Sequence, residues 1–315
     1  MAAIPESQWL ADRMVVLIGA SGFVGRHVAQ ALLATGARLR LASRHPEKAY
    51  DVQPLAGLGQ AQWVACDVTR PETVAPLLDG AAAVVNLAGA FAGDLDAVQG
   101  RGAGRIAALA AQAGARAYVH VSAIGADAAS RVAYARTKAE GEAAVQAAFP
   151  QATILRPSVI FGADDNFLNM FGALMAMMPA LPVFAPHARL QPVCVDDVAR
   201  GVAAALLAPA QHGGRTYELA GPQVLTMLEI MQAINVATGR HRCLLPLPDG
   251  VARAIAALPG TLISSDQYRL LLAGNVAGGD CPGLADMGIT PLPMGLQLDR
   301  WMARYRPSGR FGRKS

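Results

Sequence analysis

The sequence predicts an α/β protein, with a doubly wound parallel sheet followed by a smaller, irregular C-terminal lobe. Three observations support this prediction. Short buried-strand patterns alternate with helical patterns through the first half of the chain. A glycine-rich turn joins the first of these strands to the first helix. Beyond residue 157 the alternation weakens, and frequent prolines and glycines interrupt it.

The predicted elements follow one another at the spacing of a parallel sheet. The strands are short apolar runs, at 14–18, 38–42, 62–65, 83–87, 117–121 and 153–155. The helices carry apolar residues at helical spacing, at 23–33, 71–78, 99–113, 134–148, 196–207 and 226–238. Strands separated by helices of this length predict a sheet that is covered on both faces. We therefore expect a dinucleotide-binding Rossmann domain at 1–156, a smaller lobe at 157–303 with segments that return to the sheet, and a basic tail at 304–315.

Charge and cysteine placement exclude several classes of protein. The net charge is +4, but five basic residues and no acid lie in 304–315, so the rest of the chain carries a net charge of −1. This balance argues against a nucleic-acid-binding surface. The four cysteines are far apart and no CxxC pair occurs, which argues against zinc and disulfides and favours a reducing compartment.

The chain shows no signal peptide, and its longest uncharged stretch, 166–186, is broken by prolines. We expect a cytoplasmic protein without a transmembrane segment. The alternative is a peripheral location on the cytoplasmic face of the inner membrane, through the basic tail. For the methionine-rich stretch 166–186, one interpretation is core of the second lobe. The other is a flexible apolar wall for a large hydrophobic substrate, a partner or a membrane.

A phosphate-binding turn is predicted directly after the first strand. Gly19, Gly22 and Gly25 are spaced GxxGxxG and lead into the first helix. Glycines let the backbone turn sharply and approach a pyrophosphate, and the helix N-terminus presents free N–H groups to it. Tight packing also requires glycine, but this position between strand and helix favours a dinucleotide.

The second strand predicts a preference for NADP(H), with NAD(H) as the alternative. An NAD site usually has an acidic residue here, whereas this chain has Ser43 and Arg44. An arginine can pair with a 2′-phosphate and stack on adenine. The other interpretation of Arg44 is an ordinary solvated side chain.

A candidate proton-transfer set comprises Ser122, Tyr134 and Lys138. Tyr134 and Lys138 are four residues apart and so lie on one helix face, and Ser122 ends a strand twelve residues earlier. A nearby ammonium is expected to lower the pKa of Tyr134 toward the working range of a general acid or base. The six histidines are assigned no chemistry, because they are scattered along the sequence.

Taken together, these motifs resemble the extended or atypical short-chain dehydrogenase/reductases over about residues 14–220. The resemblance implies that the turn lines the pyrophosphate, that two residues border adenine, and that three lie along the nicotinamide-side ribose. Lys138 would also bond that ribose, and the segment after the sixth strand would face the nicotinamide. In that order, the implied cofactor residues are Gly19, Ser21, Gly22, Phe23 and Val24; Asp67 and Val68; Leu87, Ala88 and Gly89; and Pro157, Val159 and Ile160.

Four stretches are similar to one branch of that family, the nucleotide-binding accessory subunit of respiratory complex I and its bacterial relatives. They are residues 134–142, 156–162, 165–167 and 191–198. The branch implies a bound, structural NADPH and complex I partners. This chain keeps Ser122, Tyr134 and Lys138 together, which not every member does.

Two main functions follow. The first is an accessory or assembly subunit of complex I that holds NADP(H). The alternative is an active NADP-dependent oxidoreductase or epimerase-like enzyme that uses the Ser/Tyr/Lys set. A third interpretation, a redox-sensing regulator, predicts ready exchange of the nucleotide with the free pool.

Overall fold

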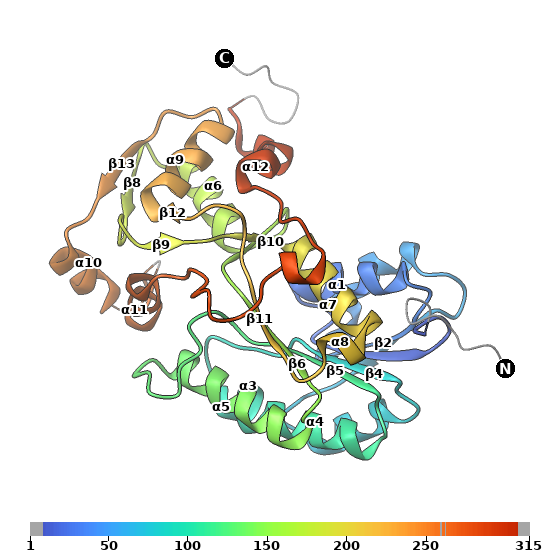
Figure 1. Ribbon diagram of the computed structural model, residues 1–315. Helices are drawn as coiled ribbons and strands as arrows, with labels where there is room; N and C mark the ends of the chain where they lie inside the picture. Colours follow the sequence, from blue (N-terminus) through green and yellow to red (C-terminus); the bar gives the residue numbers. More distant parts are fainter. Residues whose placement is uncertain (1–8, 259, 262, 308–315) are drawn as a thin grey trace. The chain divides into compact units, whose positions relative to one another are not determined.

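The computed structural model describes residues 9–258, 260–261 and 263–307, and it divides into two compact units (Figure 1). The first holds the chain up to Pro157 together with Val195–Leu219 and Gly279–Thr290. The second holds Ser158–Cys194, Ala220–Gly278 and the chain from Pro291 onward. Two segments beyond residue 157 therefore belong to the first unit.

The first unit is built on a seven-stranded sheet in which every neighbouring pair is parallel, in the order β11-β6-β5-β4-β1-β2-β3. This confirms the predicted fold class. The order reverses between β1 and β4, and open sheets of this kind bind ligands beside such a reversal, at the carboxyl ends of the strands. The strands are β1 (Met14–Ile18), β2 (Arg38–Ser43), β3 (Ala61–Ala65), β4 (Ala83–Asn86), β5 (Ala117–Val121), β6 (Thr153–Pro157) and β11 (Thr216–Leu219).

Helices cover both faces of this sheet (Figure 1). On one face α1 (Phe23–Leu33) packs against α7 (Val195–Leu207), and on the other α4 (Arg101–Gln112) packs against α5 (Ala133–Ala148) and the short α3 (Leu95–Gln99). The core beneath α4 and α5 joins strand and helix side chains, among them Val84, Ile106, Tyr118, Val145 and Ile154. The short helices of this unit are η2 (Pro46–Leu55), α8 (Pro209–His212) and η4 (Ala285–Met287).

One predicted helix is confirmed with slightly shifted ends, and another is interrupted. The helix predicted at 99–113 is α4, which begins at Arg101, and the Asp96 carboxylate accepts the N–H of Arg101 at 2.9 Å. The one predicted at 71–78 is α2 (Pro71–Val74) followed by the 3₁₀ turn η3 (Ala75–Leu78). Pro76 lacks the N–H that would continue an α-helix.

The second unit packs helices around a separate core. Its helices are α6 (Phe167–Met177), α9 (Met227–Ala237), α10 (Asp249–Ala256), α11 (Ser265–Ala273), α12 (Met294–Met302) and η5 (Ala303–Tyr305). Its short strands form two-stranded sheets, in which β7 pairs with β10, β9 with β12 and β8 with β13. These strands are β7 (Ile160–Phe161), β8 (Ala180–Val183), β9 (Arg189–Leu190), β10 (Val193–Cys194), β12 (Leu225–Thr226) and β13 (Cys243–Pro246). The capping box of Thr226 and Glu229 fixes the predicted start of α9.

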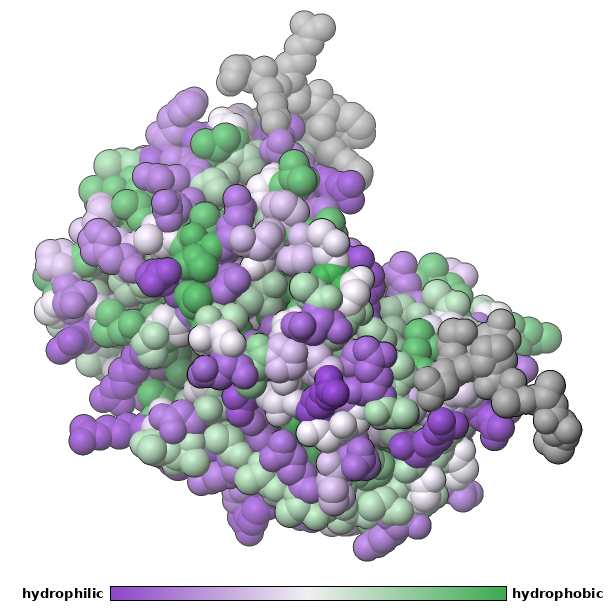
Figure 2. Space-filling view, in the orientation of Figure 1, coloured by the Kyte–Doolittle hydropathy of each residue, from purple (hydrophilic) through white to green (hydrophobic). Residues whose placement is uncertain are grey.

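The methionine-rich stretch has features of both interpretations. Leu168 and Met175 of α6 are fully buried in the second unit's core, whereas Met177 is 81% exposed. Exposed apolar side chains are not gathered into one area on the face that Figure 2 shows, where green and purple residues are interspersed.

The first residues of the predicted basic tail belong to the second unit. Arg304 donates through Nε to the carbonyl of Trp301 at 3.1 Å, and Arg306 donates through Nε to that of Ala237 at 3.2 Å. Residues 308–315 of that tail lie outside the described residues. Among the residues described, no helix is long and apolar enough to cross a bilayer, and no His, Cys, Asp and Glu side chains cluster as metal ligands.

The close packing of α4 on α5 predicts that Gly104 cannot carry a side chain. A β-carbon at Gly104 would lie 2.6 Å from the β-carbon of Ala144. We expect Gly104→Val to lower the free energy of unfolding by about 1–3 kcal/mol, because the helices must move apart. Urea denaturation measures this.

Gly250 in α10 is the matched control, because nothing lies within 4 Å of the corresponding β-carbon. Gly250→Ala should leave stability unchanged or raise it by up to about 1 kcal/mol. Equal losses in the two variants would contradict the packing assigned to Gly104.

Candidate functional site

The predicted site residues of the first unit lie at or beyond the carboxyl ends of its strands, except for those carried by α1 and α5. Because all the strands are parallel, these ends share one edge of the sheet. Gly19 follows β1, Arg44 follows β2, Asp67 follows β3, Leu87 follows β4 and Ser122 follows β5. Pro157 ends β6, and its carbonyl accepts the N–H of Ile124 at 3.0 Å.

The turn after β1 has the geometry that an anion requires. Gly19 has φ +87°, a conformation that favours glycine. A β-carbon at Gly25 would collide with the carbonyl oxygens of Gly19 and Ala20, so this glycine lets α1 pack directly on the turn. Gly22 caps α1 without a side chain, and the first turn contains no acid. The N–H groups of Phe23 and Val24 therefore remain available to a phosphate.

Arg44 and Asp67 lie close together at the ends of β2 and β3. The N–H of Cys66 donates to the carbonyl of Ser43 at 2.9 Å, which joins the two strand ends. The pKa of Asp67 is lowered chiefly by hydrogen bonds from Thr69, with smaller contributions from Arg70 and Arg44. Arg44 is exposed, and Val68 packs partly against the core. The edge thus presents a guanidinium beside an ionised carboxylate.

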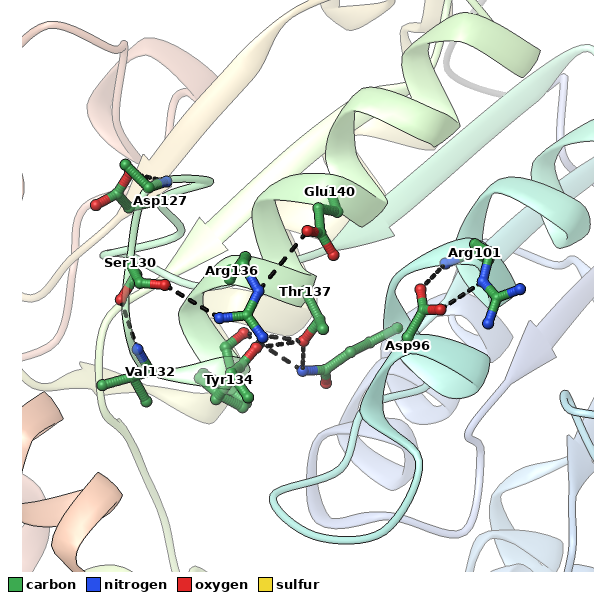
Figure 3. A network of polar contacts seen from close by, with 12 residues as sticks. Asp96, Arg101, Asp127, Ser130, Val132, Tyr134, Arg136, Thr137 and Glu140 are labelled. Atoms are coloured by element: carbon green, nitrogen blue, oxygen red, sulfur yellow. Dashed lines mark hydrogen bonds and ion pairs between the residues drawn. The ribbon is translucent and has the colours of Figure 1, made fainter.

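A buried amide network shapes the loop after β4. The Asn86 side chain accepts the N–H of Ala88 at 3.0 Å. Gln99, fully buried, accepts the N–H of Ala90 at 3.1 Å and donates to Thr137 at 2.9 Å. Figure 3 shows the Thr137 end of this contact, beside Tyr134. Gln99 therefore clamps the loop that carries Leu87, Ala88 and Gly89 against α5.

Lys138 is buried next to this loop. Its Nζ donates to the carbonyl of Val121 at 3.2 Å, and a β-carbon at Gly89 would lie only 3.3 Å from the same nitrogen. Burial lowers the pKa of Lys138 to about 8, and Glu142 acts in the opposite direction. The ammonium is thus next to the loop that the family resemblance assigns to the ribose.

Tyr134 and Ser122 are close to this edge, but the pKa of Tyr134 is not lowered as expected. The Tyr134 ring stacks on Phe91, with centroids 4.5 Å apart and the planes 10° from parallel. The expected lowering of the Tyr134 pKa is wrong, because burial raises this pKa to about 12. Lys138 Nζ is 6.0 Å from the Tyr134 ring centroid. The Ser122 hydroxyl is buried, and within the described residues it has no hydrogen-bond partner.

His120, which was assigned no chemistry, lies within electrostatic reach of Lys138. It is fully buried on β5, and burial together with Lys138 lowers its pKa to about 3, so it is neutral. Asn86 Nδ2 lies 3.4 Å from His120 Nδ1, which makes Nδ1 the acceptor and Nε2 the protonated nitrogen. The alternation of β5 could have revealed His120, because it lies two residues before Ser122. Gln99 and Phe91 carried no comparable signal.

Two predicted cofactor residues, Val159 and Ile160, belong to the second unit. Asn275 holds the start of this segment, because its Oδ1 accepts from the Ser158 hydroxyl at 2.6 Å and from the Val159 N–H at 2.8 Å. The N–H of Val193 then donates to the carbonyl of Val159 at 2.9 Å. The segment is therefore fixed within its own unit.

Comparison with known proteins agrees with this geometry. Residues 19–171 match the family described as NAD(P)H-binding, and residues 126–259 match the RmlD substrate binding domain. A subunit of Mus musculus, NADH dehydrogenase [ubiquinone] 1 alpha subcomplex subunit 9, mitochondrial, is 30% identical over 93% of this chain and 80% of its own length. The chain belongs to this branch of the extended short-chain dehydrogenase/reductase family.

Members and neighbours of the family include enzymes. The protein named ceramide reductase from Caulobacter vibrioides is 32% identical over 75% of this chain and 74% of its own length. Among solved structures, the triphenylmethane reductase of Citrobacter sp. complexed with NADP(H) has a TM-score of 0.73 at 19% identity, covering 92% of this chain and 99% of that one. This last likeness shows the shared fold.

The Gln99 clamp predicts a local effect on the loop after β4. We expect Gln99→Met to leave the Ala90 N–H unpaired, which lowers the free energy of unfolding by about 1–3 kcal/mol. Hydrogen exchange at Ala90 should accelerate. Gln62→Met on β3 is the control, because Gln62 is exposed and its side chain accepts a hydrogen bond from Arg40 at 3.3 Å, far from the loop after β4 in the sequence. Unchanged exchange at Ala90 in the Gln99 variant would rule out the clamp.

Proposed function

We propose that this protein is a nucleotide-binding accessory or assembly subunit of respiratory complex I, with NADP(H) as a structural element. The match to a subunit 9 protein over most of both chains carries this proposal. The complex I partners come from that relative's printed name. The peripheral location at the membrane comes from the basic residues near the C-terminus.

The geometry of the first unit supports a held nucleotide. In this proposal the pyrophosphate lies against the turn at Gly19, Ser21, Gly22, Phe23 and Val24, and adenine lies between Arg44 and the Asp67–Val68 pair. The ribose on the nicotinamide side lies along Leu87–Gly89 and is bonded by Lys138, and Pro157 faces the nicotinamide. The uncapped start of α1 and the unpartnered hydroxyl of Ser122 fit such a ligand.

The arrangement of Ser122, Tyr134 and Lys138 favours binding over turnover. Lys138 donates to the Val121 carbonyl, and Tyr134 has a raised pKa and stacks on Phe91. A phenol with a pKa of about 12 is a poor base near neutral pH. The raised Tyr134 pKa and the hydrogen bond of Lys138 to Val121 therefore support the binding role.

A reductase is the second candidate, and the ceramide reductase relative favours it. Its substrate would be a carbonyl on a ceramide-class lipid. Bound NADPH would supply the hydride. Ser122 would orient the carbonyl oxygen, and Tyr134 would donate its phenolic proton to it.

Native fractionation combined with Tyr134→Phe separates the two functions. A structural role predicts that the protein migrates with complex I from low-salt membranes, and that the variant keeps its nucleotide and its place. An enzymatic role predicts a fall of about 10²–10⁴ in reductase turnover. A protein that fractionates free of complex I and loses turnover in the variant would contradict the accessory role.

The NADP(H) preference is tested at Arg44. We expect Arg44→Ala to weaken NADPH binding about tenfold and NADH binding much less, because only NADPH has the 2′-phosphate that the guanidinium can pair with. Calorimetric titration of both nucleotides measures this. Arg70→Ala is the control. Arg70 also lies near Asp67, but it is in the loop after β3, whereas Arg44 directly follows β2. Tighter binding of NADH than of NADPH by the unaltered protein would overturn the preference.

A further inference from the structure

A partly buried ion pair joins Glu142, one helical turn after Lys138 on α5, to Arg156 on β6. Tyr134, Lys138 and Glu142 follow one another at intervals of four residues, so they lie along one stripe of the helix. Glu142 is 5% exposed and accepts two hydrogen bonds from Arg156 Nε, at 2.9 and 3.2 Å, and one from a terminal guanidinium nitrogen at 2.6 Å. This fork-to-fork contact joins α5 to β6.

The ion pair holds the Glu142 carboxylate in place on the helix residue one turn after Lys138. Hydrogen bonding to Glu142 raises the pKa of Arg156, so the guanidinium stays charged and holds the carboxylate in one orientation. A buried ammonium whose own surroundings favour the neutral form needs such a charge to keep its proton. Glu142 is the one partner that acts on Lys138 in this direction among the residues described.

The other groups around this cluster do not replace that charge. His120 on β5 is neutral. Tyr134 on α5 is neutral below about pH 12. Gln99, from α3, and Gly89, from the loop after β4, carry no charge. Beyond Arg156 lie Glu218, its register partner on β11, and Cys281, which act on Arg156.

We propose that Glu142, held by Arg156, is a positioning residue that keeps Lys138 protonated and thereby sets the highest pH at which the first unit binds a nicotinamide nucleotide. The nucleotide part of this inference rests on the function proposed above, whereas the effect on Lys138 does not. The affinity falls as pH rises through the Lys138 pKa, because the neutral amine loses its charge-assisted bond to the ribose. Without Glu142 that fall occurs at lower pH.

The chain allows a direct measurement of Lys138, because it contains only three lysines, Lys48, Lys138 and Lys314. Labelling lysine with ¹³C at Cε gives three resonances, and Lys138→Arg identifies the one of interest. We expect Lys138 in the nucleotide-free protein to titrate near pH 8. Glu142→Gln should lower this midpoint by about one pH unit, since it removes an opposite charge at close range.

A double variant guards against misfolding, because Glu142→Gln leaves the Arg156 guanidinium without its partner. Glu142→Met with Arg156→Met replaces the whole ion pair by apolar side chains, which proteins commonly tolerate. It should move the Lys138 midpoint in the same direction by a smaller amount. Glu140→Gln is the control. Glu140 is on the same helix, and its pair with Arg136 is exposed and 3.8 Å long (Figure 3).

NADPH affinity is then measured between pH 6 and 9 for the same proteins. A midpoint of binding that falls together with the Lys138 resonance in both Glu142 variants, and not in Glu140→Gln, supports the inference. An unmoved Lys138 midpoint, or an affinity lowered equally at every pH, overturns it and leaves Glu142 a structural residue. Failure of the unaltered protein to bind NADPH or NADH at any pH would instead contradict the proposed function, while the Lys138 titration still tests the ion pair.

Discussion

The burial of one ammonium, that of Lys138, constrains the whole edge of the sheet around it. A buried charge is tolerated only where polar groups face it. Here the Val121 carbonyl accepts a hydrogen bond from the Lys138 ammonium, and the charge of Glu142 offsets part of the lowering of the Lys138 pKa by burial. The neighbours accommodate this charge in turn. His120 stays neutral, and Gly89 leaves room for the nitrogen. The Glu142–Arg156 pair also joins α5 to β6, so the same charges that surround Lys138 fix the helix that carries Tyr134.

The sequence could predict those features that depend on a few consecutive residues, but not those that depend on side-chain contacts. The strands and the turn at Gly19–Gly25 could be predicted, because a short, continuous apolar run and a glycine-rich turn are properties of a few consecutive residues. The carboxyl-edge positions of Arg44, Asp67 and Ser122 then followed from parallel pairing alone. The helix predicted at 99–113 is α4, but periodicity did not locate its first residue, because the Asp96 side chain accepts the N–H of Arg101 at that end.

The electrostatics of the site could not be predicted in the same way. Spacing placed Tyr134 and Lys138 on one helix face, but it could not say that burial outweighs the ammonium at Tyr134, or that Phe91 stacks on that ring. Gln99 joins two segments about forty residues apart, and such a contact exists only once the chain has folded. The sign of a pKa shift depends on this tertiary surrounding.

The two kinds of relative fit one physical picture. A fold that holds a nucleotide at the carboxyl edge of a parallel sheet can serve chemistry or structure, and the difference lies in whether Tyr134 is activated. In this chain the binding turn, the guanidinium of Arg44 and the buried Lys138 are all in place, whereas Tyr134 is stacked on Phe91 and has a raised pKa. The structural role proposed for NADP(H) rests on that combination.

The central claim, that NADP(H) is a structural element of this protein, is tested most directly by the exchange rate of its bound nucleotide. The protein would be purified without added nucleotide, its content measured by mass spectrometry, and isotopically labelled NADPH then added in excess. The account predicts close to one NADP(H) per chain and replacement by the labelled form only over hours. Complete exchange within seconds, or a purified protein that contains no nucleotide, would contradict it.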